Sequence, residues 1–355
     1  MTSIIEETEL QRRTRSSPLP RLFKNFGSAF FSIAITMIGL LAVTFIIGRV
    51  MPIDPVLAVV GDKASTEVYE AAYKAMGLDK PLILQFGIYI KDVFTGNFGV
   101  STLTARPVIQ DIARVFPATL ELATVATILG VIFGVPAGVI AAVNKGGWSD
   151  QIIRVVGLFG YSMPIFWLGL VGLLIFYGKL DWVAGPGRLD VFFDDIVPQV
   201  SGMILLDSLL AGETEIFFNA LSHIILPATI LGYYSLAYIS RMTRSFMLEQ
   251  LSQEYITTAR VKGLSETVVI WRHALRNVMV PLITVIALSY ANLLEGSVLT
   301  EMIFAWPGIG SYITNALFSA DMAAVLGGTV IVGAVFIGIN LLSDILYKIV
   351  DPRAR

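Results

Sequence analysis

The sequence predicts an all-α protein that crosses a membrane six times. Hydrophobic residues make up 55% of the 355 residues and charged residues only 15%, with a mean hydropathy of +0.75. Soluble domains carry about 25% charged residues, so this balance indicates a bilayer protein. The apolar runs are uninterrupted and lack the alternation of a membrane barrel, which leaves helices as the spanning elements.

Six segments are long and apolar enough to cross about 30 Å of hydrocarbon, which takes roughly 20 helical residues. The first follows a polar tail and has no small-residue cleavage site before Arg49, so we interpret it as a span rather than a signal peptide. The spans are predicted at Ser28–Gly48, Val115–Val143, Arg154–Gly178, Phe217–Ser240, Asn277–Leu299 and Asp321–Tyr347.

Small residues and prolines modify three of these spans. Gly130, Gly134 and Gly138 stand at four-residue intervals in span two, which predicts close packing of helix backbones. Spans two, three and four each contain a proline, which either kinks the helix around a cavity or is simply tolerated. These prolines are Pro136, Pro164 and Pro227.

Basic charge in short loops predicts which side each loop faces. Both tails and the loop between spans four and five are rich in Lys and Arg, whereas residues 179–218 hold two basic and seven acidic residues. We therefore expect both termini in the cytoplasm. The chain divides into a cytoplasmic tail (1–27), a first transmembrane helix (28–50), an extracytoplasmic loop (51–114), a five-helix core (115–347) with a cytoplasmic hairpin at 249–276, and a cytoplasmic tail (348–355).

Charge and composition exclude several other functions. The formal net charge of −2 argues against a nucleic-acid partner, which would need clustered Lys and Arg. The absence of cysteine excludes disulfides, thiolate metal sites and thiol nucleophiles. His223 and His273 are expected on opposite sides of the membrane, so we expect no metal site.

The loop between spans four and five carries the most informative pattern. Glu254 to Lys262 reads as a short polar helix, and Gly263 fits the left-handed position that follows a helix. Ser265 is placed to cap a second helix, with Glu266 in its favoured first turn. That second helix is predicted to end near Arg276, before Pro281 opens the fifth span. An amphipathic helix lying on the membrane surface is the alternative interpretation.

This hairpin resembles the coupling-helix (EAA) region of permease subunits of ATP-binding-cassette (ABC) importers. The residues of this hairpin are similar to those of the dipeptide/oligopeptide/nickel branch of that family. One departure is that Thr257 and Thr258 occupy the positions of the acid and the first alanine of the general motif, and the acid stands earlier, at Glu254. The matching residues are Glu254, Tyr255, Ala259, Arg260, Lys262, Gly263, Leu264, Ser265, His273 to Asn277, and Pro281.

The resemblance covers nearly the whole chain beyond about residue 25. The outer segments are similar to those of the B-type peptide permease subunit, and the matching blocks occur in order along the six spans. These blocks are Asp54-Pro55, Gly77–Asp79, Pro81-Leu82 with Gln85, Gly96–Gly99 with Ser101, Pro117–Glu121, Phe304–Gly310 and Asp351–Arg353.

The resemblance implies a type I ABC importer permease fold in a bacterial inner (cytoplasmic) membrane. It implies that the residues of the hairpin string, from Glu254 to His273, dock on an ATPase subunit. The implied partners are a C-type permease subunit, two ATPases that bind ATP and Mg, an extracytoplasmic binding protein and membrane lipid. This chain has no GxxxxGK[ST] phosphate loop, so it is not expected to be an enzyme or to bind a cofactor itself.

Three carboxylates, Glu121, Glu295 and Asp344, fall at or near membrane depth, where a charge is costly unless it faces water or a partner. Asp344 lies near the cytoplasmic end of the last span, and we interpret it as structural. Glu121 and Glu295 either line the substrate path, where one could meet a peptide amino terminus, or make interfacial or interhelical hydrogen bonds. The sequence leaves both interpretations open.

The implied cargo is a di- or oligopeptide, although nickel, opine and glycoside importers use similar permeases. An ATP-independent secondary transporter would show internal inverted repeats and broken polar helices at midplane, and no convincing repeat is present. A membrane-embedded enzyme would need clustered acids, histidines or a motif such as HExxH, and none occurs.

Overall fold

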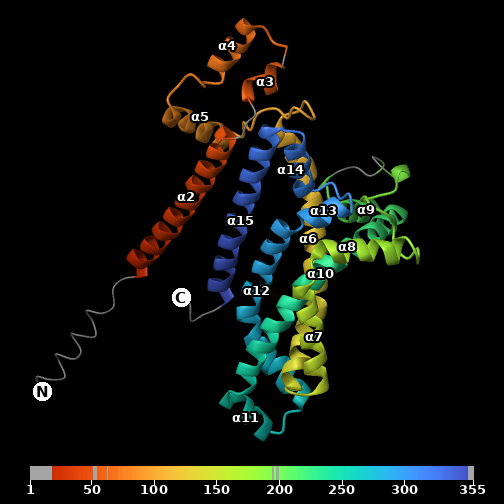
Figure 1. Ribbon diagram of the computed structural model, residues 1–355. Helices are drawn as coiled ribbons and strands as arrows, with labels where there is room; N and C mark the ends of the chain where they lie inside the picture. The colour runs from red at the N-terminus through yellow and green to blue at the C-terminus, as the bar shows by residue number, and fades with distance from the viewer. Residues whose placement is uncertain (1–17, 51–53, 62, 194–195, 197–199, 351–355) are drawn as a thin grey trace, which may run out of the picture. The chain divides into compact units, whose positions relative to one another are not determined.

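The computed structural model describes residues 18–50, 54–61, 63–193, 196 and 200–350 (Figure 1). The chain divides into two units, residues 1–51 and 52–355. In the first unit the described residues form α2 (Pro18–Val50), which contains the apolar stretch Ile33–Val50. This helix begins inside the predicted tail 1–27. Residues 1–17 and 351–355, which make up most of the two predicted tails, lie outside the described residues.

The second unit is helical, with one isolated β-bridge among its described residues. Four long helices form its bundle, and shorter helices lie in the connections (Figure 1). The long helices are α6 (Val108–Val143), α10 (Thr214–Leu251), α12 (Leu275–Gly296) and α15 (Met322–Val350). The shorter ones are α3 (Pro55–Val60), α4 (Thr66–Ala75), α5 (Leu82–Phe94), α7 (Trp148–Ser162), α8 (Ile165–Gly172), η1 (Leu173–Tyr177), η2 (Val191–Phe193), α9 (Ile204–Ala211), α11 (Glu254–Val261), η3 (Val268–Ala274), α13 (Val298–Ile303) and α14 (Ile309–Phe318).

Within the part of the chain that the structure describes, five helical segments are long and apolar enough to span a membrane, namely those in α2, α6, α10, η3–α12 and α15. The third predicted span, Arg154–Gly178, is not a straight helix. It consists of Trp148–Ser162 and Ile165–Tyr177, which meet at an angle of 99°. The break falls at Met163 and Pro164, because a residue before proline is pushed out of the helical region and proline has no amide hydrogen to continue the ladder.

The glycines of span two let α6 pack closely against α10. A Cβ atom at Gly130 would lie 2.5 Å from the Ser235 hydroxyl, and one at Gly138 would lie 2.6 Å from the Ser240 carbonyl oxygen. Gly134 faces Ile239 in the same way. The predicted packing role of these glycines is therefore confirmed. Pro136 and Pro227, by contrast, lie inside continuous helices.

Several helices extend past their predicted ends. α6 begins at Val108, inside the segment assigned to the outer loop, and α10 continues beyond Ser240 to Leu251. These extensions place the first turns of α6 and the last turns of α10 at opposite ends of the bundle (Figure 1). α11 lies at the same end as the last turns of α10, and α3 to α5 lie at the other.

The outer segment is tied to the bundle through the loop before α6. The Ser101 hydroxyl donates a hydrogen bond to the Asp321 carboxylate, and the amide N–H of Leu103 donates to the same carboxylate at 3.2 Å. Asp321 is fully buried at the start of α15. Farther out, Asp54 caps α3 and accepts a hydrogen bond from the Tyr69 hydroxyl at 2.7 Å.

Candidate functional site

The coupling hairpin (residues 249–276) is built around a left-handed turn. Gly263 has φ +79°, as its sequence position predicts. The amide of Gly263 donates to the Arg260 carbonyl at 2.9 Å and the amide of Leu264 donates to the Ala259 carbonyl at 3.3 Å. This pair of bonds is the Schellman motif, which satisfies the last carbonyls of a helix and reverses the chain. The turn therefore ends α11 sharply.

An exposed ion pair closes the turn from outside. The Arg260 guanidinium donates to both Glu266 carboxylate oxygens, at 2.8 and 3.2 Å. Both side chains are about half exposed, so the pair contributes at most roughly 1 kcal/mol. Its geometry nevertheless favours the reversal that Gly263 begins.

The second half of the hairpin differs from the prediction. It is not a separate short helix that ends before Pro281. A helix starts at Glu266, passes through the π-helical η3 and runs directly into α12, so Pro281 lies inside α12 rather than at its start. The Ser265 hydroxyl makes no hydrogen bond with the described residues; the Ser265 carbonyl instead accepts from the Val269 amide at 3.0 Å. The second half of the hairpin and the span are consequently one continuous rod, which α11 joins through the turn at Gly263.

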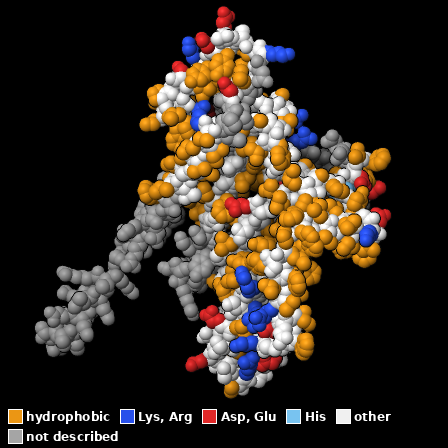
Figure 2. Space-filling view, in the orientation of Figure 1, with side chains coloured by type: hydrophobic (Ala, Val, Ile, Leu, Met, Phe, Trp, Pro, Cys, Tyr) orange, Lys and Arg blue, Asp and Glu red, His pale blue; other side chains and the backbone are white. Residues whose placement is uncertain are grey.

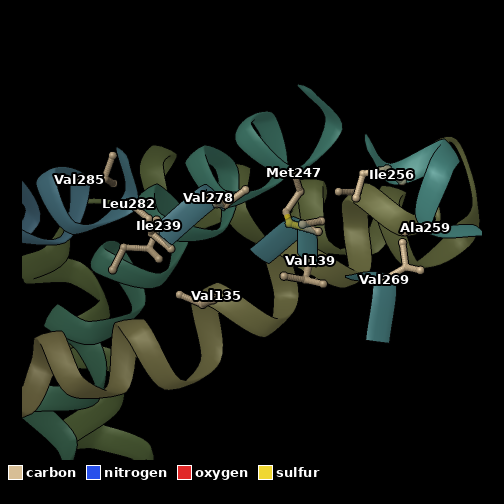
Figure 3. Packing of buried hydrophobic residues seen from close by; sticks show 12 residues of the cluster. Val135, Val139, Ile239, Met247, Ile256, Ala259, Val269, Val278, Leu282 and Val285 are labelled. Carbon is tan, nitrogen blue, oxygen red and sulfur yellow. The ribbon is translucent and has the colours of Figure 1, made fainter. Parts of the chain in front are cut away.

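The inner face of the hairpin is buried against the bundle (Figure 3). Ile256 and Val269 are fully buried and Ala259 is nearly so. They pack in one cluster with Val139 of α6 and Met247 of α10. Burying Ile256 or Val269 stabilises the contact by roughly 1.5–3 kcal/mol each, so α11 is held against the bundle. Ala259, predicted as a docking residue, lies on this inner face.

The outer face of the hairpin is exposed and mixed in character. Lys and Arg side chains gather at the end of the bundle where α11 lies (Figure 2). Large apolar side chains stand among them: Val261 is 83% exposed and Trp271 is 44% exposed. Of the residues predicted to dock on an ATPase, His273 is half-buried and the following are exposed: Glu254, Tyr255, Arg260, Lys262, Gly263, Leu264 and Ser265. Exposed apolar groups rimmed by charge are typical of a protein-binding surface.

A partly buried ion pair ties the first turn of α7 to the same end of α10. The Arg244 guanidinium donates to both carboxylate oxygens of Asp150, at 2.7 and 2.8 Å. Asp150 also accepts from the Gly146 amide at 2.9 Å. The sequence does not indicate this pairing, because the two residues lie 94 positions apart.

Glu121 has both carboxylate oxygens engaged. One accepts from the Leu205 amide at 2.7 Å, and the other forms an ion pair with Arg188. Arg188 also lies over the Trp306 ring, 5.4 Å from its centroid. These contacts join α6 to the loop before α9 and favour the structural interpretation of Glu121.

Glu295 is exposed near the end of α12, and no hydrogen bond or ion pair reaches its side chain from the described residues. A carboxylate at the end of an apolar span needs water or a partner. Of the two predicted carboxylates, Glu295 is thus the one still free to face a path or a second subunit.

Sequence analysis missed Glu301, a fully buried carboxylate in α13. Its oxygens accept from the Thr119 hydroxyl at 2.7 Å, the Ser297 hydroxyl at 3.0 Å and the Ser311 amide at 2.9 Å. Burial raises the pKa of Glu301, while these donors oppose the shift. The carboxylate therefore joins α6, α13 and α14 at one point.

Glycines make room for that carboxylate. A Cβ atom at Gly308 would lie 2.4 Å from the Glu301 carboxyl group, and one at Gly310 would lie 2.9 Å from it. The block Phe304–Gly310 and the residue Thr119 were both recognised in the sequence. Glu301, the partner that they share, was not recognised, because nothing in the sequence connects the two segments.

Comparison with known proteins gives a consistent result. Residues 134–355 match the family model of binding-protein-dependent transport system inner membrane components, and residues 26–123 match the N-terminal model of binding-protein-dependent transport system membrane components. A probable D,D-dipeptide transport system permease protein of Escherichia coli K12 is 43% identical over 323 residues, which is 91% of this chain and 95% of the relative.

Two further relatives carry similar names. A di/tripeptide transport system permease protein of Pseudomonas aeruginosa is 43% identical over 321 residues, covering 90% of this chain and 95% of its own length. A dipeptide transport system permease protein of Haemophilus influenzae is 42% identical over 335 residues, covering 94% of this chain and 100% of its own length.

Proposed function

This chain belongs to the family of binding-protein-dependent transport system inner membrane components, and from that premise we propose how it works. It forms one half of the translocation pathway of an ATP-driven importer and converts closure of partner ATPases into alternating access. The continuous rod from the coupling hairpin into α12 carries this proposal. An ATPase that moves the exposed outer face of the hairpin would move a membrane span with it.

Two features make the rod suited to this task. The inner face is anchored by fully buried Ile256 and Val269, so a push on α11 reaches α6 and α10 as well as α12. The Schellman turn at Gly263 fixes the angle between α11 and the rod. Packed elements of this kind move as units rather than deforming continuously.

The proposed cargo is a short peptide. Relatives that match nine-tenths of this chain are named as permeases for D,D-dipeptides, di- and tripeptides, and dipeptides. Identity above 40% along such a length supports the same substrate class here.

The proposed assembly contains a second, C-type permease subunit, two ATPase subunits and an extracytoplasmic binding protein. The ATPases hold ATP and Mg, since this sequence contains no phosphate-binding loop. The hairpin and both termini face the cytoplasm, which the basic loops favour. The segment with α3 to α5 then faces outward, where a binding protein would dock.

Co-purification with the neighbouring gene products tests this proposal. The expected result is a complex with a second permease and two ATPases, whose ATP hydrolysis rises on adding binding protein and a dipeptide. Glu254→Arg should weaken ATPase recovery because it reverses a charge on the exposed hairpin face. Glu70→Arg, an equal change on exposed α4, is the matched control and should leave ATPase recovery unchanged. A chain that moves peptide in liposomes without ATP would overturn the proposal.

A further inference from the structure

A cavity of about 760 Å³ opens at the end of the bundle opposite the coupling hairpin. Its walls come from the first turns of α6, the segment before α9, α9 itself, and the turn that leads into α14. Sites for small organic molecules are typically about 300–1,000 Å³. The cavity is thus of the size that holds a small molecule rather than a flat docking surface.

Two of the charged groups in its wall are already neutralised. Arg188 pairs with Glu121 and donates to the Gly202 carbonyl at 3.1 Å. Asp207 is buried, which opposes its ionisation, but the Ser201 hydroxyl and the amides of residues 200–202 donate to it and lower its pKa. Both groups hold the loop in shape and leave little charge for a ligand.

Two arginines in the wall have no such partners. Arg106 precedes α6 and Arg114 lies in its second turn, and both side chains are exposed. No side-chain hydrogen bond or ion pair from the described residues reaches either guanidinium. Arginine binds carboxylates through paired, charge-assisted hydrogen bonds, so this wall is suited to an anionic group.

Asp111 supplies the opposite charge in the same cavity. It is 6% exposed, and its Oδ2 atom accepts from the Thr104 hydroxyl and, at 3.5 Å, from the Tyr312 hydroxyl. Its Oδ1 atom accepts no hydrogen bond from the described residues. Asp111 and Arg114 are three residues apart on α6 and therefore share one face of the helix.

We propose that this cavity binds a short zwitterionic peptide, with Arg106 and Arg114 receiving its carboxylate and Asp111 its amino group. This inference rests on the proposed function, because it makes the cavity an entry site on the permease for that cargo. An acidic side chain of a partner protein would use the arginines alone. The presence of both signs of charge in one small-molecule cavity favours the peptide.

Direct binding to the purified chain tests the inference without requiring transport. Saturation-transfer NMR in detergent would compare dialanine, dialanine amide and N-acetyl-dialanine. Dialanine should bind, and removal of either charged end should weaken binding about tenfold, the effect of losing one charge-assisted hydrogen bond. Equal binding of all three peptides would overturn the inference.

Variants locate the site. Arg106→Gln and Arg114→Gln should each weaken dialanine binding about tenfold and remove the preference over dialanine amide. Lys91→Gln, which removes an exposed cation from α5, is the matched control. It should change neither the affinity for dialanine nor the preference for dialanine over dialanine amide. Normal dialanine binding in both arginine variants would overturn the inference.

Transport by the assembled importer separates this inference from the proposed function. If the wild type imports dialanine and both arginine variants show a raised KM for dialanine only, both proposals are supported. If the arginine variants raise KM equally for dialanine and its amide, the arginines contact a partner protein and the inference is wrong. If the chain binds dialanine but no ATP-driven import occurs, the proposed function fails while the binding site stands.

Discussion

Gly263 is the residue on which the direction of the hairpin depends. Its φ of +79° lies in the left-handed region, and an added Cβ would meet no atom within 4 Å. Any penalty for a larger residue there comes from the backbone and not from crowding. A left-handed conformation costs an ordinary L-residue roughly 1–2 kcal/mol, least for asparagine and most for β-branched residues.

Gly263→Val should therefore uncouple transport without removing the chain from the membrane. We expect lower ATPase recovery and lower peptide uptake, with unchanged amounts of the chain in the membrane. Gly263→Asn is the matched control, because asparagine tolerates the left-handed region. This variant should retain most of the ATPase recovery and most of the peptide uptake. Full uptake by Gly263→Val would show that this turn does not set the lever angle.

Glu301 is a buried carboxylate whose environment changes its ionisation. Burial raises its pKa, so the folded chain holds a proton at pH values where the unfolded chain has released it. The stabilisation that this group provides is complete below about pH 4.5, its unfolded value, and declines as pH rises through the folded pKa.

Glu301→Gln should flatten the dependence of stability on pH. Thermal unfolding in detergent between pH 4.5 and 7.5 should show that the wild type loses more stability over this range than the variant does. The slope is the readout, since the absolute stability of Glu301→Gln also reflects lost hydrogen bonds. Glu67→Gln on exposed α4 is the control; equal slopes in wild type and Glu301→Gln would contradict the expectation.

At the scale of elements, the contact between α6 and α10 depends on missing side chains. Gly130, Gly134 and Gly138 present their backbone to Ser235, Ile239 and Ser240. Gly232 of α10 faces α6 in the same way, because a Cβ atom added there would lie 2.9 Å from the Ala126 carbonyl oxygen. Association of helices in a membrane relies on such close packing, because lipid provides no hydrophobic drive between them.

Gly138→Ala and Gly157→Ala should shift stability in opposite directions. Alanine favours a helix over glycine by about 1 kcal/mol, and at Gly157 an added Cβ meets nothing within 4 Å, so that variant should melt higher. At Gly138 the Cβ would lie 2.6 Å from a backbone oxygen, so overpacking of about 1–3 kcal/mol should dominate and the melting temperature should fall. Thermal unfolding in detergent measures both, and a rise at Gly138 would disprove the close contact.

At the scale of the whole molecule, the sequence predicts the spans better than their joints. Long apolar runs identified α6, α10, α12 and α15 because each run exceeds the bilayer thickness. The sequence left open whether Pro164 kinks its span or is tolerated, and the structure has a 99° bend there. A proline within an apolar run is equally compatible with a continuous helix, as Pro136 and Pro227 show. The left-handed conformation of Gly263 was predicted from its position after a short helix, and the structure confirms it.

The pairing of distant residues was beyond sequence reasoning. Arg244 with Asp150, Arg188 with Glu121, and Thr119 with Glu301 each join segments separated by tens of residues or more. Local patterns carry no information on such partners. The continuous helix from Glu266 into α12 was missed for a different reason. The polar residues before Asn277 suggested that the helix ends there, whereas the same helix continues from this polar segment into the apolar span.

The orientation of the molecule can be tested because the chain has no cysteine. Lys74→Cys on α4 and Thr257→Cys on α11 place single thiols on exposed surfaces at opposite ends of the second unit. A membrane-impermeant maleimide should label Lys74→Cys in intact cells and Thr257→Cys only after permeabilisation. The reverse pattern would invert the proposed topology.

The π-helical η3 connects the hairpin to α12 with more residues per turn than an α-helix has. A helix of this kind can be regarded as an α-helix that has accepted one extra residue. Deleting one residue within η3 would permit an ordinary α-helix and leave the residues on either side close to their present orientation, because the wide turn absorbs the extra residue. Deleting one residue from the α-helical part that follows would instead rotate every residue before it by about 100° around the axis of α12. In that second case the surface that α11 offers would face a different neighbour, so chain length between η3 and the membrane span, and not only residue identity, determines which way the hairpin points.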